Sequence, residues 1–218
     1  MFIGHFAAGF AAKKADSSVS LGWTFFAAQW LDLLWPVLLL TGTEHVELAA
    51  GKDAPVPLSF THYPISHSLL VVAGWALLIG LLYYFLKRNK RGAILVGMLV
   101  LSHWLLDFIV HIPDLPLAPF SEMKTGMGLW NYKWVSFGIE MLLFAAGFMI
   151  YLEATKAINQ KGNWILYSLA FFLLLIHCMN VFGPPPADTK PIAWVGLSQW
   201  LLVFWAYKAD ANRKARTV

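Results

Sequence analysis

Charged residues are scarce in this chain. Only 13% of its 218 residues are charged, whereas soluble domains carry about 25%. Hydrophobic residues make up 59% and aromatic residues 16%, so the composition excludes an ordinary soluble domain and indicates a membrane protein. The net charge of +4 does not point to nucleic acid as a partner, because the basic residues lie between apolar runs.

Cysteine is almost absent as well. Cys178 is the only one in the sequence, which excludes a disulfide within the chain. No internal repeat is visible, and this weakens the interpretation of the chain as an inverted-repeat transporter. The first residues lack a basic segment ahead of their apolar stretch, so we expect mature protein there rather than a signal peptide.

What the chain does contain is a series of long apolar runs, each close to the ~20 residues that a bilayer core requires. We expect spans at about 21–42, 66–86, 92–111, 134–152, 163–182 and 191–208. Residues 2–12 are apolar but too few to cross a membrane. The sequence therefore predicts an all-α, polytopic bundle over residues 1–218, with about six transmembrane helices and a short, half-inserted N-terminal helix.

The distribution of Lys and Arg predicts the orientation of these spans. If six helices cross, one side receives Lys13 and Lys14, the 87–91 segment, Lys156 and Lys161, and the basic residues of 208–216. The other side receives Lys52, Lys124, Lys133 and Lys190. By the positive-inside rule, we expect the N- and C-terminal regions near the cytoplasmic side.

The segment 102-SHWLLDFIVH-111 places three ionisable residues in one span. His103, Asp107 and His111 are four residues apart and so share one face of a helix. An aspartate inside a membrane costs roughly 2.5–3.5 kcal/mol on insertion scales, so something must compensate it. Asp32 and Glu140 also lie within spans, and no Lys or Arg lies in a span interior to neutralise them.

Buried carboxylates without a cationic partner either take up a proton or bind a metal ion. Nearby imidazoles favour the metal, because His and Asp together suit zinc and similar divalent ions. In the expected topology, ionisable groups from most helices converge on one outward-facing pocket. These groups are His5, Asp32, His62, His67, His103, Asp107, His111, Glu140 and His177.

Each of these residues also has a structural interpretation. Asp32 can be protonated and hydrogen-bonded to Gln29, and His103 can form a local hydrogen bond with Asp107. His111, close to Pro113, can be interfacial, and His177 can stabilise helix packing.

At these residues the chain resembles the membrane-bound metal-dependent hydrolase family of bacteria. The resembling parts cover roughly residues 1–115 and are His5–x3–Gly9, Asp32, the SHS around His67, and His103–x3–Asp107. That family is distantly similar to zinc-dependent phospholipase C, an all-helical fold with a multinuclear zinc site. The resemblance implies one divalent ion, expected to be zinc, held by Asp32, His67, His103 and Asp107. A second ion would be bridged by Asp107 and bound by His5.

Two motifs depart from the family pattern. The segments 30-WLDLLWP-36 and 62-HYPISHS-68 lack one acid and carry Tyr63 and Pro64 where Arg and Gly are expected. These departures affect the expected substrate chemistry more than metal binding.

The leading hypothesis is a metal-dependent hydrolase of the bacterial inner membrane. We expect a phosphoesterase that acts on a lipid or lipid-linked headgroup at the outer face, with Glu140 or His62 as general acid or base. Two alternatives stay open. One is a small transporter or proton conductor that uses a relay of intramembrane ionisable groups, and the other is a non-catalytic metal-binding assembly factor.

Overall fold

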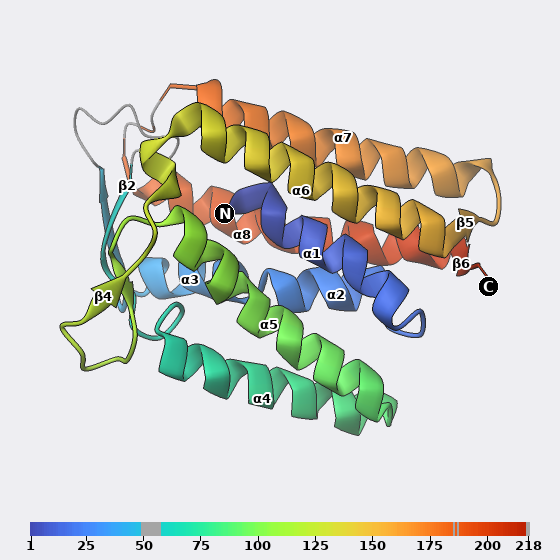
Figure 1. Cartoon of the computed structure of the whole chain (residues 1–218), viewed down its shortest axis with the longest axis horizontal. Helices are drawn as coiled ribbons and strands as arrows, with labels where there is room; N and C mark the ends of the chain where they lie inside the picture. Colours follow the sequence, from blue (N-terminus) through green and yellow to red (C-terminus); the bar gives the residue numbers. More distant parts are fainter. Residues whose placement is uncertain (49–57, 185, 187, 217–218) are drawn as a thin grey trace.

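The computed structural model describes residues 1–48, 58–184, 186 and 188–216, and these form a bundle of α-helices (Figure 1). Lys52, one of the cations expected on the outer side, lies outside the described residues. The helices are α1 (Phe2–Ala15), α2 (Leu21–Ala28), α3 (Trp30–Leu40), α4 (Leu69–Lys87), α5 (Lys90–Val110), α6 (Lys133–Ala154), α7 (Gln160–Phe182) and α8 (Lys190–Ala211).

Four of these helices, α4 to α7, are long and apolar enough to cross a membrane. A fifth crossing results if α2 and α3 are taken as one bent span. The prediction of about six spans is therefore supported only as far as four to five. The expected span at 191–208 falls on α8, which has 22 residues but is not among the candidate spans. Ser198, Gln199 and Lys208 contribute to its lower hydropathy.

The apolar run expected as a single span at about 21–42 is broken at Gln29. The axes of α2 and α3 differ by 54° across this residue. Pro36 within α3 packs against α8 at Gly196, where an added Cβ would lie 2.6 Å from Pro36 Cγ. The break leaves the Ala28 carbonyl to accept from His103 Nδ1 and places Asp32 in the first turn of α3.

Helix α1 lies in the middle of the bundle, packed against α6 and α2 (Figure 1). Its Phe10 contacts Phe25 of α2 and Phe144 of α6 through edge-to-face ring packing. Gly147 of α6 permits the close approach, because a Cβ there would overlap the carbonyl oxygen of Ala7. The helix expected to be half-inserted is thus enclosed by other helices.

One end of the bundle collects the basic residues expected in the cytoplasm. Lys13 Nζ lies 2.8 Å from Asp210, and Lys14 Nζ lies 3.1 Å from Glu153. Arg91 donates a hydrogen bond to the carbonyl of Ala15. The short strands β5 (Thr155–Ala157) and β6 (Arg213–Ala215) pair antiparallel at the same end.

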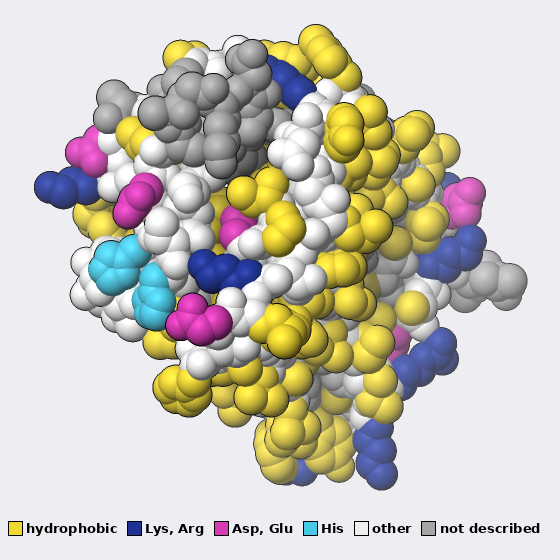
Figure 2. Space-filling view, turned by 60° about the vertical axis from the view of Figure 1, so that its left-hand side comes forward, with side chains coloured by type: hydrophobic (Ala, Val, Ile, Leu, Met, Phe, Trp, Pro, Cys, Tyr) yellow, Lys and Arg dark blue, Asp and Glu magenta, His cyan; other side chains and the backbone are white. Residues whose placement is uncertain are grey.

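The opposite end carries two small antiparallel hairpins. Strand β1 (His45–Leu48) pairs with β2 (Leu58–His62), and β3 (Leu115–Pro116) pairs with β4 (Lys124–Thr125). A 3₁₀ turn at Leu129–Asn131 leads into α6. Figure 2 shows histidine, acidic and basic side chains at the surface here, whereas hydrophobic side chains dominate the flank of the bundle. The candidate site lies inside the bundle, next to this hairpin end.

Candidate metal centre

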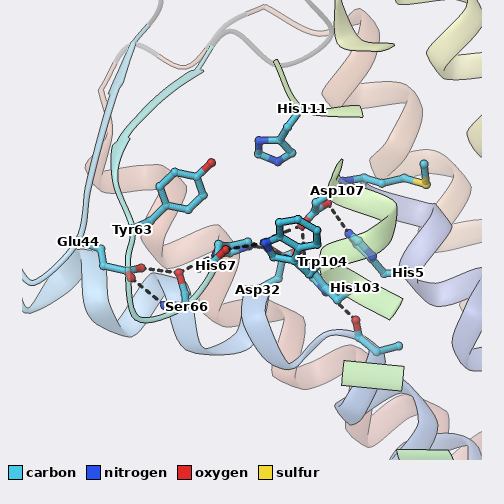
Figure 3. A network of polar contacts seen from close by, with 12 residues as sticks. His5, Asp32, Glu44, Tyr63, Ser66, His67, His103, Trp104, Asp107 and His111 are labelled. Atoms are coloured by element: carbon cyan, nitrogen blue, oxygen red, sulfur yellow. Dashed lines mark hydrogen bonds and ion pairs between the residues drawn. The ribbon is translucent and has the colours of Figure 1, made fainter. Parts of the chain in front are cut away.

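The five predicted ligands come together between α1, α3 and α5 (Figure 3). They group as His5, His103 and Asp107, and as Asp32, His67 and His103, with the ligand atoms of each group within 4.8 Å of one another. His103 is common to both groups. All five are buried except Asp32, which is half-buried and lines a cavity.

Asp107 is at the centre of the cluster. Its Oδ1 lies 3.0 Å from His5 Nε2 and also accepts a hydrogen bond from the α-amino group of Met1. Its Oδ2 lies 3.1 Å from His103 Nε2 and 3.8 Å from His67 Nε2. The rings of His5 and His103 stack with centroids 3.6 Å apart, which fixes both planes. One oxygen of Asp107 therefore faces His5, and the other faces His67 and His103.

The bend between α2 and α3 sets the tautomer of His103. Its Nδ1 lies 2.7 Å from the carbonyl oxygen of Ala28, the last residue of α2. A carbonyl oxygen only accepts, so Nδ1 carries the hydrogen. In the neutral ring, Nε2 then holds a lone pair, and this atom faces Asp107 without a hydrogen-bond partner among the described residues.

A buried chain of polar groups sets the tautomer of His67 (Figure 3). The carboxylate of Glu44 accepts hydrogen bonds from the backbone amides of Ile65 and Ser66 and from the Ser66 hydroxyl. Since that hydroxyl has one hydrogen, Ser66 Oγ accepts from His67 Nδ1 at 2.6 Å. Burial lowers the pKa of His67 well below its ordinary value, so the ring is neutral and Nε2 holds a lone pair.

Sequence reasoning did not single out Glu44 or Ser66. Glu44 stands in a polar loop beside an exposed histidine, a context typical of solvated acids. Ser66 is one hydroxyl in the HYPISHS segment, and nothing in its spacing indicates a carboxylate partner 22 residues earlier. Only the three-dimensional contact identifies this pair.

When His103 is neutral, these two tautomers place four acceptors face to face. His67 Nε2 and His103 Nε2 each lie 3.8 Å from Asp32 Oδ1, and both also face Asp107 Oδ2. Buried acceptors that face one another repel unless a proton or a cation lies between them. Two imidazole nitrogens and two carboxylate oxygens are a donor set that suits zinc and similar divalent ions. The residues present therefore fit a divalent cation.

Glu140 and His62, predicted as acid or base, lie in different surroundings. Glu140 is buried on α6, lines the cavity beside Asp107, and places its carboxyl against the first backbone amides of α1. A carboxylate at a helix N-terminus is stabilised by the amides and the helix dipole. Its Oε2 has no hydrogen-bond partner among the described residues. His62 is exposed on β2 opposite His45 and does not line the cavity, so the structure does not bring it to the cluster.

His111 follows α5 at the mouth of the cavity. Its Nδ1 lies 2.9 Å from Asp114 Oδ1, which also accepts a hydrogen bond from the hydroxyl of Tyr63. Its ring packs on Trp130, with the ring centroids 4.0 Å apart. His111 thus ties the end of α5 to the hairpin loops and is not part of either ligand group.

A cavity of about 780 Å³ extends from the cluster. Asp32, His67, Asp107 and Glu140 line its polar part, and α7 and α8 line the remainder with mostly apolar side chains. Its volume is in the range of sites that bind small molecules, about 300–1,000 Å³.

Comparison with known proteins gives a family and a location. No curated protein and no solved structure matches the chain. The family model described as YdjM inner membrane protein matches residues 1–184. That description gives a membrane and no reaction, so hydrolase activity and likeness to zinc-dependent phospholipase C stay predictions, whereas the prediction of a multi-pass protein of the bacterial inner membrane is supported. With the matched residues covering most of the sequence, the chain belongs to the YdjM inner membrane protein family.

Proposed function

We propose that the protein is a metal-dependent hydrolase, a phosphoesterase that acts on a lipid or lipid-linked headgroup at the outer face of the inner membrane. One observation carries this proposal: the Nε2 atoms of His67 and His103 face the carboxylates of Asp32 and Asp107 within 3.1–3.8 Å. These four residues would hold one divalent ion, zinc being the expected metal. His5, at Asp107 Oδ1, would bind a second.

A divalent ion supplies Lewis-acid activation of water and stabilises charge on phosphoryl oxygens. The chain itself orients the ligands that such chemistry requires. Glu44 and Ser66 hold His67 with Nε2 toward the cluster, and the Ala28 carbonyl does the same for His103. Such supporting partners fix the ligand tautomer and raise metal affinity.

Glu140 is the acid or base of this proposal, in place of His62. Its carboxyl lines the same cavity as Asp107 and has one oxygen without a partner among the described residues. A general base must lie within hydrogen-bond reach of the proton that it takes, and an exposed residue outside the cavity does not meet this condition.

The orientation that we propose places the basic end of the bundle in the cytoplasm. Lys13, Lys14 and Arg91 contact groups at that end, and the cluster lies toward the opposite, hairpin end. The cavity then opens at the outer leaflet, where a headgroup can enter while its chains stay in the bilayer.

The packing around α1 favours a closed pocket over a proton relay. Between the cluster and the Lys13–Asp210 pair, α1 is packed by the buried aromatic rings of Phe6, Phe10 and Phe25. A relay requires a continuous series of polar groups through the membrane. The aromatic layer interrupts such a series along α1.

Element analysis of the purified protein tests the metal. We expect wild-type protein to retain a divalent ion and Asp107→Asn to lose it, because the substitution removes the negative charge that faces His5, His67 and His103. Asp188→Asn is the matched control, since Asp188 is exposed and outside the cavity. No metal in the wild type, or equal metal in wild type and Asp107→Asn, would contradict the proposal. If a proton at His103 takes the place of the metal, the wild-type protein will contain no metal.

Phosphate release from lipid substrates tests the reaction. We expect release by the wild type that stops on chelation and returns when the metal is restored. Metal binding without release from any phosphate-bearing lipid would favour the non-catalytic assembly factor.

A further inference from the structure

The cavity reaches beyond the cluster to the side of the bundle. From Asp32 and Asp107 it continues between the halves of α7 and α8 that lie toward the hairpin end. There its lining is mostly apolar and includes Ile176 of α7 and Ile192 of α8.

The two helices are in close contact at the basic end and leave a space toward the hairpin end. At the basic end, Leu169 of α7 belongs to the same buried cluster as Ala206 and Ala209 of α8, and Trp205 Nε1 donates to the Ile165 carbonyl. Toward the hairpin end, side chains from both helices line the cavity and also face outward. Met179 is 59% exposed, Val195 64% and Leu201 67%. Because these side chains border the cavity and the outer surface, they mark a lateral opening.

Helix α7, on one side of the opening, is a candidate membrane span, so we expect hydrocarbon rather than water outside it. Most of the exposed lining residues there are apolar, with Asn180 and Ser198 as polar exceptions. A molecule that passes between α7 and α8 therefore comes from the bilayer and has an apolar portion.

The inner wall of the cavity presents polar groups that lack partners. His177 is only 2% exposed, lies between the rings of Phe2 and Phe137, and lines the cavity. Neither of its ring nitrogens has a hydrogen-bond partner among the described residues. A buried polar group without a partner is costly, so a ligand that supplies one is stabilised there. Lys133 also lines the cavity and is the one basic side chain in its described lining.

We infer that the ligand of this cavity is a phosphate-bearing membrane lipid that enters sideways between α7 and α8. The phosphate headgroup meets His177 and Lys133 on its way to the Asp32 and Asp107 carboxylates, and the acyl chains remain between the two helices. Lys133 complements the negative charge of the headgroup. The assignment of this lipid as a substrate rests on the proposed function, whereas its binding does not.

Photo-crosslinking tests the route. The probe is phosphatidic acid with a diazirine in its acyl chain, in phosphatidylcholine vesicles that contain the purified protein, with labelled peptides mapped by mass spectrometry. The double variant Val195→Trp/Leu201→Trp narrows the opening. Leu142→Trp is the matched control, because Leu142 is 73% exposed on α6 and does not line the cavity.

We expect labelling of wild type and Leu142→Trp to concentrate on α7 and α8, and to fall about tenfold in the double variant, equivalent to about 1.4 kcal/mol of binding. His177→Phe, which keeps a ring between Phe2 and Phe137, is expected to lower labelling by phosphatidic acid more than labelling by the same probe with a choline headgroup. Equal labelling of wild type and the double variant, or labelling spread evenly over α4 to α8, would overturn the inference.

A second readout separates this inference from the proposed function. If both hold, the double variant loses hydrolysis of a long-chain lipid phosphate and keeps hydrolysis of a short-chain, water-soluble phosphoester. Labelling confined to α7 and α8 in a protein without hydrolysis overturns the proposed function alone. Unchanged long-chain hydrolysis in the double variant overturns the lateral route alone.

Discussion

The hydroxyl of Ser66 links Glu44 to His67, so its removal measures how far this hydrogen-bonded series supports metal binding by His67. Ser66→Ala removes the only side-chain acceptor of His67 Nδ1 in the described structure and leaves that N–H in a buried site. An unsatisfied buried donor costs about 1–3 kcal/mol, which corresponds to a factor of roughly 5–150 in an equilibrium constant. Loss of a group that supports a metal ligand lowers affinity by about 10–100-fold, which lies within this range. We therefore expect metal affinity to fall by about 10–100-fold.

The assay is competition for the metal with a chromophoric chelator in detergent solution. Ser68→Ala is the matched control, because Ser68 is equally buried in the same loop and its hydroxyl donates to the Pro64 carbonyl rather than to a ligand. Ser66→Ala loses two hydrogen bonds, to Glu44 and from His67, and Ser68→Ala loses one, so Ser66→Ala should be the less stable variant in chelator, and only Ser66→Ala should bind metal more weakly. Unchanged metal affinity in Ser66→Ala, or an equal loss in both variants, would refute this account of His67.

Three further predictions concern packing, charge and pH. Gly147→Ala adds a methyl group against the backbone of α1 and should destabilise the protein by about 1–3 kcal/mol, whereas Gly138→Ala, with open space around its Cβ, should stabilise it by up to about 1 kcal/mol; thermal unfolding in detergent compares them, and similar melting temperatures would contradict the packing. Lys13→Met removes the cation from the part-buried Asp210 carboxylate, which keeps its hydrogen bond from Tyr151, and should cost about 1.5–3 kcal/mol, against at most about 1 kcal/mol for Lys14→Met at an exposed pair; equal losses of unfolding free energy on denaturation would show that burial does not matter here. Because burial lowers the pKa of His67, protons should displace metal only well below pH 6.5; element analysis after dialysis measures this, and release that begins above pH 6.5 would exclude a neutral, buried ligand.

The candidate ligands could be selected from the sequence because an ionisable side chain is conspicuous in an apolar run. Asp32 and Asp107 stand in segments without a Lys or Arg to neutralise them, and this signal does not depend on the packing of the helices. His62 was predicted as an acid or base from its place beside an expected span. The structure puts it on a hairpin strand, where the alternation of side chains directs it to the surface.

Other parts of the site leave no pattern in the sequence. The bend at Gln29 interrupts a run that is apolar on both sides, so hydropathy predicts one helix where the structure has two. The contact between Glu44 and Ser66 depends on how two loops fold over the end of the bundle. Helix α8 is a different case. Its length fits a membrane span, but its polar residues lower its hydropathy, and it is not among the candidate spans.

The central place of α1 has a consequence for the order of assembly. This helix is synthesised before α6, yet its closest packing is against α6, through Gly147. Contacts between segments so distant in sequence form late. His5 reaches Asp107 only once α1 has docked. Capture of the second proposed ion, which His5 would bind, would then report that α1 is in place, whereas the ion proposed for Asp32, His67, His103 and Asp107 would not depend on this step.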